Sequence, residues 1–297
     1  MKVAANGIEI EVESFGADDA PAMLLIMGLG AQLTRWSIPF VEALVARGYR
    51  VIRYDNRDVG LSTKFDAAGA PKLARIMGLA MIGVKARVPY TLDDMAADAI
   101  GVLDALGIDR AHIVGASMGG MIAQLVAAHY PERTLSLTSI MSTTGNRSLP
   151  RATKEATAVL MDRPKTRDRE TIIAHAVRAA AVIGSPGYRV EAGELRAKVV
   201  RDFERMHYPA GFARQIAAIT VGGDRRKRLA AITAPTLVIH GTDDPLVPIA
   251  GGRDTAASIP GAVLHEMPGM GHDLPEPLIP TVCDLIDGIA RQAEAIR

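Results

Sequence analysis

A serine set among glycines constrains the fold of this chain more than any other feature. Residues 112–120, HIVGASMGG, place Ser117 between a strand-like apolar run and a helix-like run, with Gly115 before it and Gly119 and Gly120 after it. In this Gly-x-Ser-x-Gly pattern the chain turns from strand to helix so sharply that glycine is needed for clearance. The pattern predicts a strand–turn–helix unit that raises the Ser117 hydroxyl above a sheet.

Short aliphatic runs alternate with longer helical runs along most of the chain. Residues 2–14 predict a hairpin that turns at Asn6-Gly7. Further buried strands are predicted at 22–27, 50–54, 111–115, 135–141, 235–241 and 262–267, and helices at 37–47, 91–106, 118–130, 249–258 and 275–294. This alternation is typical of an α/β fold with a mostly parallel sheet, here of eight strands, flanked by helices.

The rhythm breaks between residues 145 and 228. No buried-strand run occurs there, and alanine, arginine, lysine and glutamate dominate. We therefore predict a helical cap over residues 145–228, inserted into a core made of residues 1–144 and 229–297. Its charges fit solvated helix faces better than a recognition patch.

Composition limits the partners of the chain. The formal net charge is +1, so no overall field favours nucleic acid or an anionic membrane. No run approaches the roughly 18 apolar residues of a membrane span, and the N-terminus lacks an apolar signal region. The single cysteine, Cys283, excludes an internal disulfide framework. We expect a soluble, cytoplasmic protein; its oligomeric state stays open, with a homodimer as one option.

A serine hydroxyl needs a base to take its proton before it can attack, and the base needs a carboxylate to orient it. Of the seven histidines, His272 follows the last predicted strand in a glycine-rich loop, and it is the expected base. Asp243 and Asp244 both follow the penultimate strand. We favour Asp244 as the acid and assign Asp243 to a turn or cap. The order serine, aspartate, histidine is that of the α/β hydrolases.

An attacked carbonyl becomes an oxyanion that needs hydrogen-bond donors. The amide of Met118, directly after the serine, is one expected donor. The amide of Leu29 is the other, since Gly28 and Gly30 on either side let that backbone approach a ligand.

Three further residues are candidates for the substrate pocket. Trp36 is the sole tryptophan and lies close in sequence to the Leu29 loop; packing in the core is favoured over a substrate platform. Met77 and Met81 belong to an apolar run, residues 73–90, that could line an acyl pocket, pack in the core or form a dimer contact.

These residues together resemble the α/β-hydrolase superfamily over nearly the whole chain apart from the insertion. The segment YDNRDVGLST, residues 54–63, is similar to the superfamily's Asp-x-Arg-Gly-x-Gly-x-Ser stretch but has Asp58 where glycine is usual, and Met27-Gly28 replaces the usual His-Gly. Both departures resemble carboxylesterases related to aclacinomycin methylesterase.

The resemblance implies a serine carboxylesterase that acts on a small-molecule ester through an acyl-enzyme, with no metal or organic cofactor. Two alternatives stay open: a cofactor-free haloperoxidase or perhydrolase with the same triad, and a ligand-binding, receptor-like member of the fold.

Overall fold

The computed structural model describes residues 1–84, 86–162 and 164–295. Eight strands form one sheet in the order β1-β2-β4-β3-β5-β6-β7-β8. Their bounds are β1 Lys2–Ala5, β2 Ile8–Phe15, β3 Ala22–Ile26, β4 Arg50–Tyr54, β5 Ala111–Ala116, β6 Thr134–Ile140, β7 Thr236–Gly241 and β8 Val263–Met267. β1 and β2 pair antiparallel, β2 also pairs antiparallel with β4, and all remaining pairs are parallel. The prediction of a mostly parallel eight-stranded sheet is confirmed.

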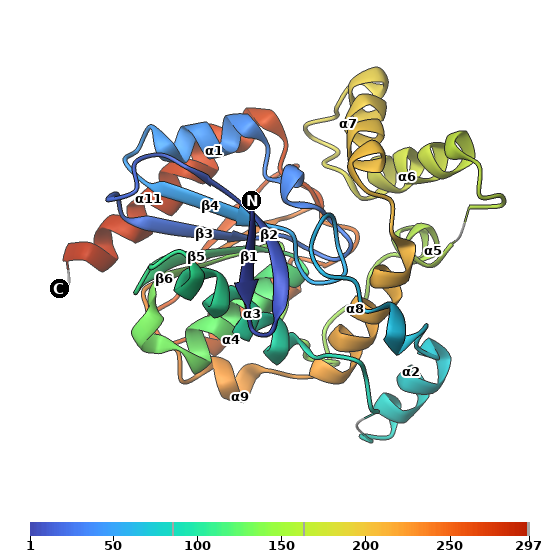
Figure 1. Ribbon diagram of the computed structural model, residues 1–297, viewed down its shortest axis with the longest axis horizontal. Helices are drawn as coiled ribbons and strands as arrows, with labels where there is room; N and C mark the ends of the chain where they lie inside the picture. Colours follow the sequence, from blue (N-terminus) through green and yellow to red (C-terminus); the bar gives the residue numbers. More distant parts are fainter. Residues whose placement is uncertain (85, 163, 296–297) are drawn as a thin grey trace.

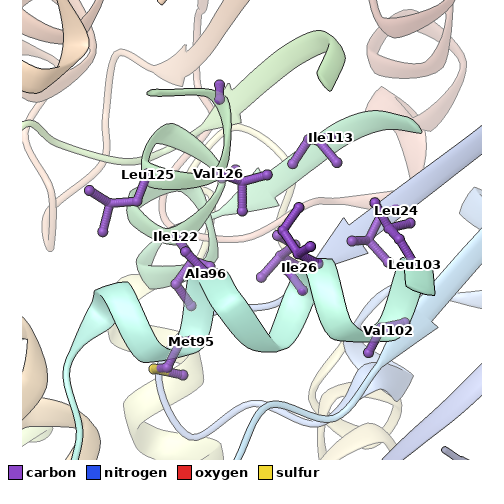
Figure 2. Packing of buried hydrophobic residues seen from close by; sticks show 14 of the residues in the cluster. Leu24, Ile26, Met95, Ala96, Val102, Leu103, Ile113, Ile122, Leu125 and Val126 are labelled. Atoms are coloured by element: carbon purple, nitrogen blue, oxygen red, sulfur yellow. The ribbon is translucent and has the colours of Figure 1, made fainter. Parts of the chain in front are cut away.

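The sheet separates two hydrophobic layers. Alternate residues of a strand point to opposite faces, so in β3 Leu24 and Ile26 enter one layer while Met23 and Leu25 enter the other. One layer is covered by α3 (Leu92–Ala105) and α4 (Met118–His129), and the other by α1 (Ile38–Val45) and α11 (Ile279–Ala295). Figure 2 shows the first layer, with side chains of α3 and α4 meeting those of the sheet: Leu24, Ile26, Met95, Ala96, Val102, Leu103, Ile113, Ile122, Leu125 and Val126.

Local sequence signals account for several boundaries. Asn6 and Gly7 both have positive φ, 49° and 77°, as a tight hairpin turn requires. Thr91 caps α3 through a reciprocal capping box with Asp94. The predicted helix at 249–258 is α10 (Ala250–Ser258), and the one predicted at 275–294 begins with a short 3-10 turn, Glu276–Leu278, before α11.

One helix was not predicted. The apolar run after residue 72 forms α2 (Leu73–Met81), whose side chains are mostly at least partly exposed. Leu73, Ile76, Met77 and Ala80 recur at helical spacing, so a period was present, but the sequence reasoning considered this run only as an apolar stretch and did not test it for one.

The segment between β6 and β7 is helical, with α5 (Lys154–Met161), α6 (Arg169–Ile183), α7 (Ala192–Arg205), α8 (Pro209–Gly222) and the short α9 (Arg226–Leu229). We call residues 145–228 the insertion. Figure 1 shows α5 to α8, coloured yellow-green to orange, standing at one side of the sheet, whereas α9 lies beneath the core. β6 and β7 are parallel neighbours in the sheet, so the chain leaves β6 at the carboxyl edge of the sheet and returns to the amino edge before β7.

No helix within residues 1–84, 86–162 and 164–295 combines the length and apolar character needed to cross a membrane.

Candidate active site

Ser117 lies at the join of β5 and α4 with a strained backbone. Its φ and ψ are 57° and −121°, a region that residues with a side chain rarely occupy. The Ser117 amide donates to the Ile140 carbonyl at 2.9 Å, and the Ser117 carbonyl accepts from the Ser142 hydroxyl at 2.8 Å. Ile140 is the last residue of β6 and Ser142 follows two residues later, so the end of the neighbouring strand holds the turn in place.

The three glycines around this serine are each required by close packing. A Cβ on Gly119 would lie 2.0 Å from the Ile26 carbonyl oxygen, and one on Gly115 would lie 2.1 Å from the Gly119 carbonyl oxygen. A Cβ on Gly120 would lie 2.6 Å from the Ser142 Cβ. Such distances are far below van der Waals contact, so α4 can approach β3 and β6 only where these side chains are absent.

Ser117, His272 and Asp244 form one chain of hydrogen bonds. The His272 Nε2 lies 2.9 Å from the Ser117 Oγ, and its Nδ1 lies 2.7 Å from the Asp244 Oδ2. The side chains of His272 and Asp244 are 7% and 0% exposed. A carboxylate at Nδ1 places the neutral imidazole's proton there and leaves Nε2 as the acceptor that faces the serine.

The other oxygen of Asp244 fixes the direction of this carboxylate. Oδ1 accepts from the amides of Leu246 and Val247 at 2.9 and 2.8 Å. Asp243 instead turns away, and its Oδ2 accepts from the Gly269 amide at 3.0 Å. The structure therefore brings Asp244, and not Asp243, to the imidazole.

His240 lies behind Asp244 and does not reach the serine. Its Nε2 is 2.7 Å from the Val247 carbonyl and 3.7 Å from the Asp244 Oδ2. Since the carbonyl can only accept, Nε2 carries a proton. Burial lowers the pKa of His240, which favours the neutral ring.

The loop after β3 lies directly beside Ser117. A Cβ on Gly28 would be 3.0 Å from the Ser117 Cβ and 3.4 Å from its Oγ, so Leu29 follows a residue already in contact with the serine. Met118 is the first residue of α4, and amides in a first helical turn have no partner within the helix. The backbone around Leu29 and that of Met118 thus flank the same hydroxyl.

Two side chains that the sequence reasoning did not identify hold this loop in place. Asn56 donates its Nδ2 to the Met27 carbonyl at 2.8 Å. Gln215, fully buried on α8, accepts from the Gly30 amide at 2.8 Å and donates to the Arg57 carbonyl at 2.9 Å. Asn56 belongs to the segment similar to the superfamily pattern, which is a signal that could have pointed to it; Gln215 has no local signal in the sequence.

Asp58, which departs from the superfamily glycine, connects the core to the insertion. Its φ is 67°, a conformation that aspartate tolerates better than most residues. Its carboxylate accepts from Nε and Nη2 of Arg214 at 2.7 and 2.9 Å, from the Tyr90 hydroxyl at 2.8 Å and from the Phe65 amide at 2.8 Å. Arg214 precedes Gln215 on α8, so the ion pair also fixes the helix that holds the Gly30 amide.

The three pocket candidates lie in two different places. Trp36 is fully buried in the core and stacks on Phe40, with 5.1 Å between ring centroids. Met77 and Met81 line a hollow of about 300 Å³ that they share with Met121 and residues of α8, among others. The structure therefore does not bring Trp36 together with the two methionines.

No group of three histidine, cysteine, aspartate or glutamate side chains within the described ranges is placed to hold a metal ion.

Comparison with known proteins defines the class. The alpha/beta hydrolase fold family matches residues 21–276, and this chain belongs to that family. Rhodomycin D methylesterase DauP of Streptomyces sp. (strain C5) is 32% identical over 89% of this chain and 90% of its own, as is DnrP of Streptomyces peucetius. Among solved structures, a meta-cleavage product hydrolase from Pseudomonas fluorescens IP01 aligns with a TM-score of 0.76 at 21% identity, covering 99% of this chain and 98% of the other.

Proposed function

We propose that the protein is a serine carboxylesterase, with Ser117 as nucleophile, His272 as base and Asp244 as the orienting acid. The observation that carries this proposal is the hydrogen-bonded chain of these three side chains beside the Gly28–Gly30 loop. Relatives described as methylesterases support ester hydrolysis as the reaction and make methyl esters the first substrates to test.

In the first half of the reaction, Ser117 Oγ attacks the ester carbonyl carbon while His272 Nε2 takes the hydroxyl proton. The carbonyl oxygen becomes negative and accepts hydrogen bonds from the amides of Leu29 and Met118. Each such donor stabilises the transition state by roughly 2.7–4 kcal/mol. The Asp244 carboxylate stabilises the imidazolium. When the C–O bond breaks, His272 gives the proton to the leaving alcohol, and the acyl group stays on Ser117.

In the second half, water takes the place of the alcohol. His272 Nε2 removes one of its protons as the oxygen attacks the acyl carbon. The second tetrahedral intermediate collapses, the Ser117 oxygen regains a proton from His272, and the carboxylic acid leaves. The same two amides bind the oxyanion in both halves.

We assign the insertion the role of a cap that limits access of water to the serine. Several contacts support a fixed position of the insertion over the core, including the Arg214–Asp58 pair, the Gln215 bond to Gly30 and a salt bridge of 2.7 Å between Arg205 and Asp55. Met77 and Met81 share a hollow with Met121, which lies one turn after Ser117 on α4, and we assign them to the border of the acyl chain.

The test compares the native protein with Ser117→Ala on p-nitrophenyl acetate, butyrate and octanoate, together with methyl esters followed by proton release. We expect turnover by the native enzyme and a loss of several orders of magnitude in Ser117→Ala. Ser148→Ala, which removes an exposed hydroxyl on the loop before α5, is the matched control and should retain full activity. Equal rates for the native protein and Ser117→Ala would overturn the proposal.

A further inference from the structure

The segment of the insertion after α6 packs backbone to backbone against the loop that carries His272. We call residues 183–187 the strap and residues 269–273 the histidine loop. The His272 amide donates to the Ile183 carbonyl at 2.7 Å, and the Gly187 amide donates to the Gly269 carbonyl at 2.9 Å. These bonds hold the histidine loop near both of its ends.

Between them, one hydroxyl bonds to the residues on both sides of the histidine. Ser185 Oγ accepts from the Gly271 amide at 2.8 Å and donates to Oδ1 of Asp273. The same Asp273 oxygen accepts from the Ser185 amide at 3.0 Å. Ser185 is 4% exposed, so these bonds are shielded from competing water.

Glycines on both segments permit this close approach. A Cβ on Gly271 would lie 2.5 Å from the Gly184 carbonyl oxygen, and a Cβ on Gly187 would lie 2.9 Å from the Gly269 Cα. Gly269 also has a φ of 75°, which residues with a side chain rarely adopt. The two segments are therefore shaped for contact with one another along their full length.

The Asp273 carboxyl accepts hydrogen bonds from Ser185 of the strap and does not bond to Ser117. Burial raises the pKa of Asp273, whereas the hydrogen bonds from Ser185 oppose this rise. A partly buried carboxyl is costly in free energy unless it is hydrogen-bonded. Asp273 therefore stays bonded to Ser185, and this bond fixes the backbone directly after His272.

We propose that Ser185 of the insertion and Asp273 of the histidine loop are positioning residues. Together they hold the His272 imidazole within hydrogen-bond reach of Ser117. The inference rests on the proposed function, since it assigns His272 the role of base. Its consequence is mechanical: the insertion cannot lift away from the core at the strap without releasing the backbone of His272. Closure of the insertion and alignment of the base are then one event.

The experiment measures kcat and KM for Ser185→Ala, Asp273→Ala and Asp273→Asn in the full chain, with folding checked by thermal unfolding. We expect Ser185→Ala and Asp273→Ala to lower kcat by about 10- to 100-fold with little change in KM, because small displacements of a catalytic group cost rates of this order. Asp273→Asn keeps an oxygen that can accept from Ser185 and should recover most of kcat.

Two controls separate positioning from a general structural effect. Glu276→Gln removes the carboxylate of an exposed pair with Lys198, also between insertion and core, and should leave kcat unchanged. In a His272→Ala background, Ser185→Ala should cause no further loss, because its effect passes through the imidazole. An equal loss in that background, or a folded Ser185→Ala with native kcat, would overturn the inference.

The inference can be tested separately from the proposed function. If the native enzyme hydrolyses esters and the folded Ser185→Ala does so equally well, only the inference fails. If the native enzyme hydrolyses none of the esters, the proposed function fails. The rate at which a fluorophosphonate labels Ser117 in the native protein and in Ser185→Ala then still reports whether the strap aligns His272. Should Ser185→Ala not fold, Asp273→Ala and Asp273→Asn answer the same question.

Discussion

Arg214 and Asp58 form a bidentate ion pair with side chains that are 1% and 0% exposed. The pair joins a helix of the insertion to the loop after β4. Removing one member of a buried pair leaves a charge without compensation, which costs more than the pair itself contributes.

We therefore predict that Arg214→Leu lowers the free energy of unfolding by about 3–5 kcal/mol. Adding Asp58→Gly should recover part of this loss, because glycine accepts the φ of 67° and no buried carboxylate remains, while the Tyr90 hydroxyl and the Phe65 amide lose their acceptor. Urea denaturation of the two variants tests this. A double variant that is less stable than Arg214→Leu would contradict it.

The two neighbouring aspartates after β7 should differ strongly in their effect on catalysis. Asp244→Asn should lower kcat by about 10⁴-fold, since an amide no longer favours the tautomer that accepts from the serine. Asp243→Asn should change kcat by less than about tenfold, because Asp243 accepts a hydrogen bond from the Gly269 amide and does not contact the imidazole. Steady-state kinetics on one p-nitrophenyl ester tests both, and a reversed order would assign the acid to Asp243.

Gln215 should affect the rate without contacting the substrate. Gln215→Leu removes the acceptor for the Gly30 amide, and we expect kcat to fall about 3- to 10-fold, the net value of one hydrogen bond. Gln292→Leu, on the exposed side of α11, is a matched control that should leave kcat unchanged. If Gln215→Leu raises KM and spares kcat, the residue serves substrate binding instead.

His240 should contribute to loss of stability in acid. Its pKa in the folded protein is lowered by burial from an ordinary value of 6.5, so below that value the unfolded chain binds a proton that the folded one does not. The free energy of unfolding should then fall as the pH decreases from about 7 to 5. Relative to pH 8, His240→Gln should lose less stability than the native protein over this range; parallel curves would show that His240 does not contribute.

The sequence indicated the parts of the site that lie at strand ends. Ser117, Asp244 and His272 each follow a predicted parallel strand, and such strands end at one edge, so their meeting follows from topology. The pattern around Ser117 also predicted that its neighbouring glycines provide clearance at the turn, although not which strands they approach.

Contacts made by the insertion could not be predicted in this way. Ser185 and Gln215 meet loops that lie 86 and 185 residues away in the chain. Their positions depend on how the helices of the insertion settle on the core, which periodicity does not encode. The departure at Asp58 was visible, but its partner Arg214 was one of many arginines in a charged segment.

The entry and exit of the insertion between two adjacent strands have a consequence for how such proteins diversify. A segment that leaves after Ile140 and returns before Thr236 can change in length or sequence without altering the pairing of β6 with β7. Grafting a foreign insertion would still demand an oxygen for the Gly30 amide and another for the His272 amide. We therefore expect a chimaera to keep full activity only if its new insertion supplies both of these acceptor oxygens.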